Sequence, residues 1–146
     1  MVTAYTKRFD QIMKLILVDC SIQLPNSEDK NTEIQSALWD TGANITCIST
    51  RLAKKLKLES FDEVLLSVAN NEIFHADTYY VQLRMGDFTI PFIKVLGIPM
   101  DESKDIIIGM DIISKGDLSI TNFQGKTVLS FREPSLETID YSLVNH

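Results

Sequence analysis

Short apolar runs rich in β-branched residues, each followed by Gly, Pro, Asn or Asp, recur along most of the chain. Runs with this length and these boundaries are typical of strands. The first long run covers residues 13–24, a polar loop follows at 25–33, and residues 34–39 resume as the partner strand. The pattern predicts a mostly β chain whose helices are short.

The longest β pattern, over residues 64–85, predicts a hairpin. Asn70 and Asn71 lie at its centre, and asparagine tolerates the left-handed conformation that tight turns require. The second arm alternates as a half-buried strand does, with apolar Val81, Leu83 and Met85 between polar Gln82 and Arg84.

Two short helices and a last hairpin complete the predicted elements. Ser49 can cap a helix over residues 51–58, because its hydroxyl can accept a hydrogen bond from an amide of the first turn. A helical turn is expected from Met110 to Gly116, and residues 117–131 predict a hairpin that turns at Gln124 and Gly125.

The length of 146 residues allows one domain with a core and not two. We expect an N-terminal extension over residues 1–12, a single domain over 13–132 and a loose tail over 133–146. The net charge of −6 argues against nucleic acid as a main partner.

No sequence feature indicates a membrane, a metal or a cofactor. Lys14 interrupts the apolar stretch that follows Lys7 and Arg8, and no stretch reaches membrane-spanning length, so the cytoplasm is the expected compartment. Cys20 and Cys47 do not demand a disulfide and form no zinc-type cluster.

One aspartate, Asp40, follows an apolar strand and precedes Thr41, Gly42 and Ala43. Gly42 lets the backbone turn sharply, the Thr41 hydroxyl can brace the loop, and the Asp40 carboxylate is presented at the end of the strand. Most such triplets are ordinary turns. A second apolar run with a glycine, residues 105–113, lies about seventy residues later and favours a catalytic interpretation.

Two carboxylates that share one proton can activate water for attack on a peptide carbonyl, because like charges about 3 Å apart cannot both ionise. The sequence supplies one such aspartate. A second would have to come from another copy of the chain.

The motifs "ALWDTGAN" and "DIIIGMDII", in this order and with a hairpin between them, resemble those of the retropepsin-like aspartic peptidases. With Trp39 before the aspartate and "NFQGKTVLSF" near the end, the sequence looks more like the bacterial members than the viral ones. The resemblance covers roughly residues 13–131. It implies a single-domain, closed-barrel-like retropepsin fold with one or two short helices. It also implies a homodimeric endopeptidase that acts on peptides or proteins without a metal or cofactor.

The resemblance implies a role for each matching residue. Asp40 is the catalytic residue, and the catalytic loop is supported by Thr41, Gly42, Ile108 and Gly109. Substrate would contact the loop and the tip of the central hairpin, the family's flap, through Ala43, Asn44, Val68, Ala69, Asn70, Asn71 and Ile73.

The chain departs from the viral members of the family at the flap tip, at one ion pair, and in the loop over residues 25–33 and the terminal extensions, which exceed the minimal family pattern. The flap tip has no glycine. Met110 and Asn44 stand where the viral enzymes have an arginine paired with an acid, so that ion pair is absent. Ala43 has no hydroxyl to favour the ionised carboxylates, which predicts a mildly acidic pH optimum.

Two other functions remain open from the sequence. One is a non-catalytic dimerisation or peptide-binding module on the same fold, and the other is an unrelated β-barrel that binds a small ligand. Asp111 is expected to cap a helix or brace a dimer, His75 to lie exposed on a strand, and Cys47 to lie in the core. Trp39 fits either a place beneath the site or one at an interface.

Overall fold

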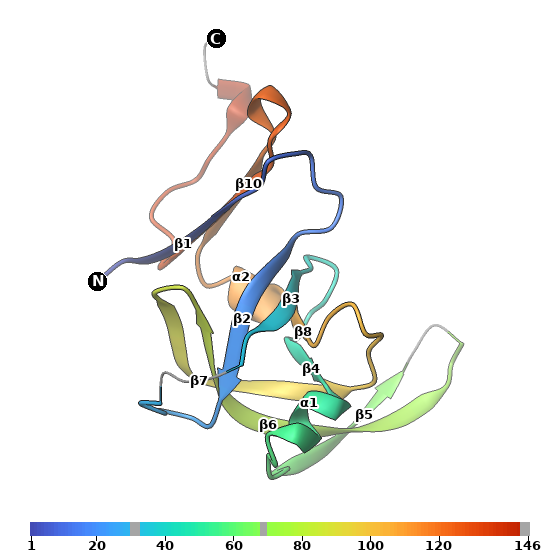
Figure 1. Cartoon of the computed structure of the whole chain (residues 1–146). Coiled ribbons are helices and arrows are strands. Elements are labelled where there is room, and N and C mark those ends of the chain that lie inside the picture. Colours follow the sequence, from blue (N-terminus) through green and yellow to red (C-terminus); the bar gives the residue numbers. More distant parts are fainter. Residues whose placement is uncertain (30–32, 68–69, 144–146) are drawn as a thin grey trace.

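The computed structural model describes residues 1–29, 33–67 and 70–143. Their strands form two sheets (Figure 1). A three-stranded antiparallel sheet has the order β1-β10-β9, and a seven-stranded sheet has the order β2-β3-β8-β4-β7-β6-β5. The larger sheet forms the barrel at the bottom of Figure 1, and the smaller sheet lies above it.

Six strands close into a barrel because β2 also pairs with β6. Around the ring the strands are β2 (Leu17–Gln23), β3 (Gln35–Trp39), β8 (Ile106–Ile108), β4 (Cys47–Ser49), β7 (Phe88–Ile98) and β6 (Ile73–Met85). The seventh strand, β5 (Asp62–Ser67), pairs only with β6. The predicted mostly β, closed-barrel fold of one domain is confirmed.

The alternating arm of the central hairpin builds the barrel interior. Val81, Leu83 and Met85 on β6 are fully buried. Burying a side chain of this kind stabilises the fold by roughly 1.5–3 kcal/mol. The expectation of a half-buried arm was wrong at Gln82, which is also buried. The loop after β2 covers it, and its amide donates to Gln23 Oε1 (3.0 Å) and to the carbonyl of Ser27 (3.1 Å).

Strand β2 is shorter than the strand predicted over residues 13–24, because the chain bends before Leu17. The Met13 amide donates to the Thr127 hydroxyl (2.8 Å), and the Ile16 carbonyl accepts from the Trp39 amide (3.1 Å). The Ile16 bond continues the β2–β3 pairing by one residue, whereas the Met13 bond draws the start of this stretch away from β3 toward Thr127.

Both predicted helices are present and short. Helix α1 (Thr50–Lys55) is capped by Ser49 as expected, since the Ser49 hydroxyl accepts the amide of Leu52 (3.1 Å). Helix α2 (Met110–Ile113) begins where predicted and ends at the C-cap Ser114, before Gly116. Among the described residues, no helix has the length and apolar character to cross a membrane.

The smaller sheet joins the two ends of the chain. Its strands are β1 (Thr3–Arg8), β10 (Val128–Glu133) and β9 (Asp117–Thr121), and Leu129 and Phe131 bury their side chains completely. The predicted turn between β9 and β10 is confirmed: Gln124 and Gly125 have φ of 53° and 76°, within a short 3-10 helix (Phe123–Gly125).

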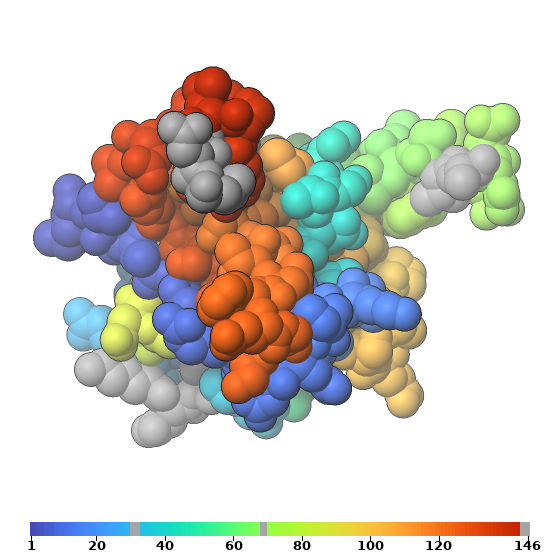
Figure 2. Space-filling model, turned by 90° about the horizontal axis from the view of Figure 1, so that it is seen from above, coloured from blue at the N-terminus to red at the C-terminus, as the bar shows by residue number. Residues whose placement is uncertain are grey.

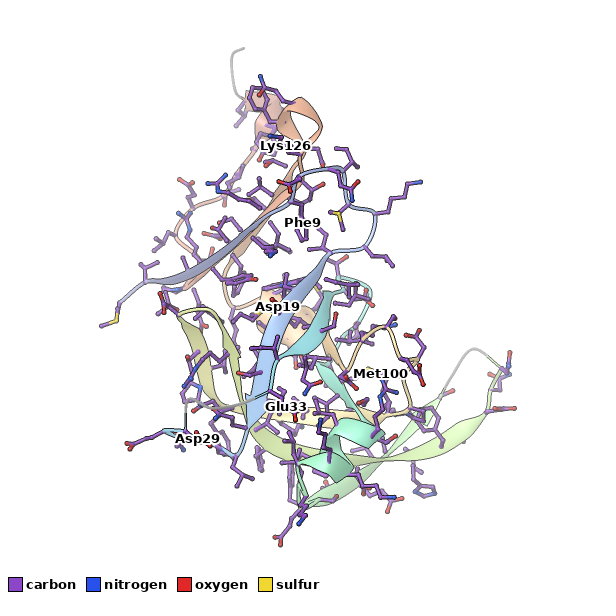
Figure 3. The ribbon with its side chains drawn as sticks, in the orientation of Figure 1. Phe9, Asp19, Asp29, Glu33, Met100 and Lys126 are labelled. Atoms are coloured by element: carbon purple, nitrogen blue, oxygen red, sulfur yellow. The ribbon has the colours of Figure 1, made fainter. Side chains whose placement is uncertain are left out.

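Side chains of the smaller sheet pack toward the barrel. Phe9, which follows β1, is partly buried against the core, whereas Lys126 marks the exposed β9–β10 turn (Figure 3). The segment 1–12 therefore supplies a strand of the sheet.

The first part of the C-terminal tail is attached to this sheet. The Asp117 carboxylate accepts hydrogen bonds from the Leu136 amide (2.9 Å), the Ser135 hydroxyl and the Arg132 guanidinium (2.8 Å). These three donors, in this order of importance, hold the pKa of Asp117 well below its usual range. Beyond them, a 3-10 turn (Tyr141–Leu143) is the last described element.

Asp117 predicts an acid-sensitive attachment of the tail. A carboxyl whose pKa is lower in the folded state stabilises that state above its unfolded pKa of about 3.9, and the contribution disappears as the pH falls through the folded pKa. We expect Asp117→Asn to lower the melting temperature at pH 7, and the difference from wild type to shrink steadily below pH ~4. Thermal melts from pH 7 down to 2 measure this. Asp10→Asn, at an exposed position, is the control, and a difference from wild type that is constant with pH would contradict the expectation.

Candidate active site

Parallel pairing of β3 with β8 brings the two sequence motifs side by side. Trp39 is the register partner of Ile108, and just beyond this pair the Asp40 amide donates to the Ile108 carbonyl (2.9 Å). Asp40 therefore leaves β3 at the level where β8 ends at Ile108 and Gly109 follows. The topology places Asp40, Ile108 and Gly109 together, as the sequence motifs indicate.

The loop after β3 is stabilised by its own amides. The Gly42 amide donates to Asp40 Oδ1 (2.8 Å), and the Ala43 amide donates to the Asp40 carbonyl (3.2 Å). Asp40 is half-buried, whereas Thr41 and Gly42 are exposed. Within the described residues the Thr41 hydroxyl has no hydrogen-bond partner, so a bracing role for it would need an acceptor from outside this chain.

The start of α2 supports the loop through the backbone. The amides of Met110 and Asp111 donate to the carbonyls of Ala43 (2.7 Å) and Asn44 (3.2 Å). Gly109 is required for this approach, because a Cβ at that position would lie 2.8 Å from the Ala43 carbonyl oxygen. These backbone hydrogen bonds attach the segment that follows Gly42 to the first turn of α2.

Thr46 and Asp111 form a second attachment that the sequence did not reveal. The fully buried Thr46 donates its amide to Asp111 Oδ2 (3.0 Å) and its hydroxyl to Asp111 Oδ1 (2.7 Å). Asp111 is not the N-cap of α2, which is Gly109 with no side-chain cap; from inside the first turn its Oδ1 accepts the Ile112 amide (2.9 Å), while the carboxylate braces the loop segment through Thr46. A buried threonine carries no sequence signal that sets it apart from an ordinary strand residue.

Cys47 lies in the core, as expected. Its thiol lies 3.3 Å from the Ile45 carbonyl. Burial first, and then the negative charge of Asp111, raise the pKa of Cys47 to about 11. Cys20 is also buried, and both thiols are free.

A depression of about 300 Å³ lies beside the loop, and Asp40 is the only carboxylate that the described part of the chain contributes to its wall. Seen from above, the segment around Asp40 (cyan) lies next to the β9–β10 hairpin (orange) and the N-terminal stretch before β2 (blue) (Figure 2). The lining residues are Lys14, Leu15, Ile16, Leu38, Trp39, Asp40, Thr41, Leu118 and Ile120. The sequence did not identify those from β9 and residues 14–16, since they come from separate parts of the chain.

Trp39 lies both beneath the loop and in this wall. Its ring packs against Phe131 with a centroid distance of 5.4 Å. Its indole nitrogen is buried, with no hydrogen-bond partner among the residues described. Trp39 thus connects the β3 end of the site to the smaller sheet.

The hairpin of β5 and β6 extends outward from the barrel (Figures 1 and 2). At its described outer end, Ser67 pairs with Ile73, and Asn71 has the left-handed φ of 59°. No hydrogen bond between described residues joins Asn70, Asn71 or Ile73 to the Asp40 loop, and Val68 and Ala69 lie outside the described residues. His75 is exposed on this hairpin, as expected, and pairs with Glu63.

Within ranges 1–29, 33–67 and 70–143, no group of three or more His, Cys, Asp and Glu side chains could hold a metal ion.

Comparison of the sequence with protein families matches residues 28–112, more than half of the chain, to the family described as aspartyl protease. The match includes Asp40, Thr41, Gly42 and Gly109. A search of curated proteins found no match.

Solved structures share the fold at low sequence identity. A retropepsin-like aspartic protease from Rickettsia conorii aligns with a TM-score of 0.55 and 11% identity over 90% of this chain and 95% of that one. The retroviral protease-like domain of Ddi1 from Leishmania major aligns with a TM-score of 0.52 and 17% identity over 74% of this chain and 82% of that one. At these identities the two structures show the fold alone, and the expected likeness to bacterial members stays a prediction. With both sequence motifs joined at one loop and the family match spanning them, the chain belongs to the aspartyl protease family and has the retropepsin-like fold.

Proposed function

We propose that the protein is an aspartic endopeptidase that acts as a homodimer and activates water between two Asp40 carboxylates. One observation carries the proposal: Asp40 lies at an accessible loop in the matched motif, and among the described residues no other carboxylate lines the depression beside it. Catalysis by a proton-sharing pair then needs a second copy of the chain.

In the proposed site the pair of Asp40 side chains holds one proton. The ionised carboxylate takes a proton from water as that water attacks the peptide carbonyl, and the protonated one donates to the carbonyl oxygen. Thr41 and Gly42 shape the loop, with Ile108 and Gly109 beneath it. The exposed Thr41 hydroxyl is free to reach an acceptor on the partner copy.

Apolar surface beside Asp40 supports the position of the second copy. Leu15 and Ile120 in the wall of the depression are 62% and 47% exposed, and Ile12 and Phe123 nearby in sequence are also exposed. In addition, β9 is an edge strand of its sheet, and an unpaired edge is a ready template for another chain. Covering this face would bring the partner against Asp40.

Substrate would bind as an extended strand between the loop and the flap hairpin. Ala43 and Asn44 would form the floor, and Ile73 with the tip residues Val68, Ala69, Asn70 and Asn71 would contact the peptide from the other side. Leu38 and Ile107 are half-buried register partners on the face opposite Trp39 and Ile108. Their apolar side chains favour apolar substrate residues around the scissile bond.

Cleavage of a mixed peptide library tests the function. We expect wild type to cleave at mildly acidic pH and Asp40→Asn to lose about 10²–10⁴-fold of that activity, because general acid–base catalysis supplies this much. Specific activity should rise with protein concentration while dimers are scarce. Cleavage by Asp40→Asn at the wild-type rate would contradict the proposal, and no cleavage by a folded wild-type dimer would favour the peptide-binding module.

The side chain at position 43 should set the pH profile. A hydroxyl there would donate to the carboxylate pair and favour its ionised form, so Ala43→Ser should move the optimum to lower pH. Rates of wild type and Ala43→Ser between pH 3 and 8 measure the shift, with Ala53→Ser as a control at a buried helix position. An unchanged or higher optimum in Ala43→Ser would contradict this expectation.

Ile120 should mark the interface between copies. A charge there would have to be desolvated on association, so we expect Ile120→Asp to weaken the dimer at least about tenfold, which corresponds to ~1.4 kcal/mol. Sedimentation over a range of concentrations measures the dissociation constant. Ile34→Asp, at a residue 63% exposed and outside the depression, is the matched control. Equal dimer affinity for Ile120→Asp and wild type would exclude this face.

A further inference from the structure

We infer that Asp111 is a positioning residue for Asp40. It acts through a continuous chain of hydrogen bonds that runs from the Asp40 amide to the Asp111 carboxylate. The inference rests on the proposed function, since it concerns the placement of the proposed catalytic residue. Asp111 itself has no place in the proton transfers.

The chain passes through one peptide unit and one side chain. The Asp40 amide donates to the carbonyl of Ile108 (2.9 Å). The same peptide unit carries the amide of Gly109, which donates to Thr46 Oγ1 (3.1 Å). The Thr46 hydroxyl then donates to Asp111 Oδ1 (2.7 Å). Every donor points the same way, from Asp40 toward Asp111.

The direction of the chain is fixed by its chemistry. Thr46 is fully buried, and its oxygen already accepts the Gly109 amide, so its one hydrogen is left for Asp111. The carboxylate cannot donate when ionised, and it also accepts the Thr46 amide (3.0 Å). Asp111 therefore holds Thr46 at two points and sets the rotamer of the hydroxyl.

An anion at the end of such a chain strengthens each link. Hydrogen bonds in series polarise one another, and those to an ionised acceptor are roughly twice as strong as neutral ones. The far end of the chain is the backbone of Asp40, whose carboxylate must meet its partner at a defined distance. A small displacement of a reacting group is costly, since about 1 Å can lower the rate 10²-fold.

The smaller sheet contains a matched control. Thr127 is also fully buried; its hydroxyl accepts the Met13 amide (2.8 Å) and donates to Asn122 Oδ1 (2.6 Å). The Thr127 hydroxyl thus also accepts a backbone amide and donates to a side-chain oxygen, but its hydrogen bonds end on a neutral amide and do not lead to Asp40. Thr127→Val thus removes the same groups as Thr46→Val without touching the Asp40 chain.

The test compares kcat and KM per folded dimer for Thr46→Val, Asp111→Ala, their double variant, Asp111→Asn and Thr127→Val. We expect Thr46→Val and Asp111→Ala each to lower kcat about 10–100-fold with little change in KM. Because both act through one chain, the double variant should lose little more than the worse single variant. Asp111→Asn should recover little of the activity, because an amide oxygen that accepts the Thr46 amide leaves the amide nitrogen, a donor, facing the Thr46 hydroxyl, which then loses its acceptor.

Hydrogen exchange of the Asp40 amide gives a readout that needs no activity. We expect faster exchange in Thr46→Val and Asp111→Ala than in wild type and Thr127→Val. If wild type does not cleave, the proposed function fails while exchange still tests the chain. The inference is overturned if Asp40 exchange is unchanged in both variants, if kcat falls equally in Thr127→Val, or if the losses in the double variant multiply.

Discussion

The parallel pairing of β3 with β8 is the contact on which the site depends. It aligns Trp39 with Ile108 and lets the Ile108–Gly109 peptide hold Asp40 on one side and Thr46 on the other. Parallel neighbours need a long crossover, so about seventy residues of hairpins separate the two motifs. The chain returns to β3 through β4, which pairs with β7 on one side and with β8 on the other.

Local chemistry made part of this structure predictable. The Asp40 motif follows a strand, the Ser49 hydroxyl caps α1, and Gln124 and Gly125 turn the last hairpin, because each depends on neighbours within a few residues. Gly109 was identified by its motif, and the structure gives the reason: the Ala43 carbonyl leaves no space for a Cβ.

Contacts between distant segments were not predictable from the sequence. Gln82 is buried because a loop fifty residues earlier folds over it, and the bend before Leu17 depends on Thr127. Thr46 looks like any strand residue until Asp111 lies beside it. The depression beside Asp40 combines β9 with residues before β2, so neither segment carries a signal alone.

The most direct test of the shared site is a mixing experiment with wild-type and Asp40→Asn chains. If each site needs one Asp40 from each copy, activity at constant total protein follows the square of the wild-type fraction once the subunits have exchanged. If a single chain carried a complete site, activity would instead fall in direct proportion to the wild-type fraction. The proposed dimer predicts the quadratic curve, and a straight line would contradict it.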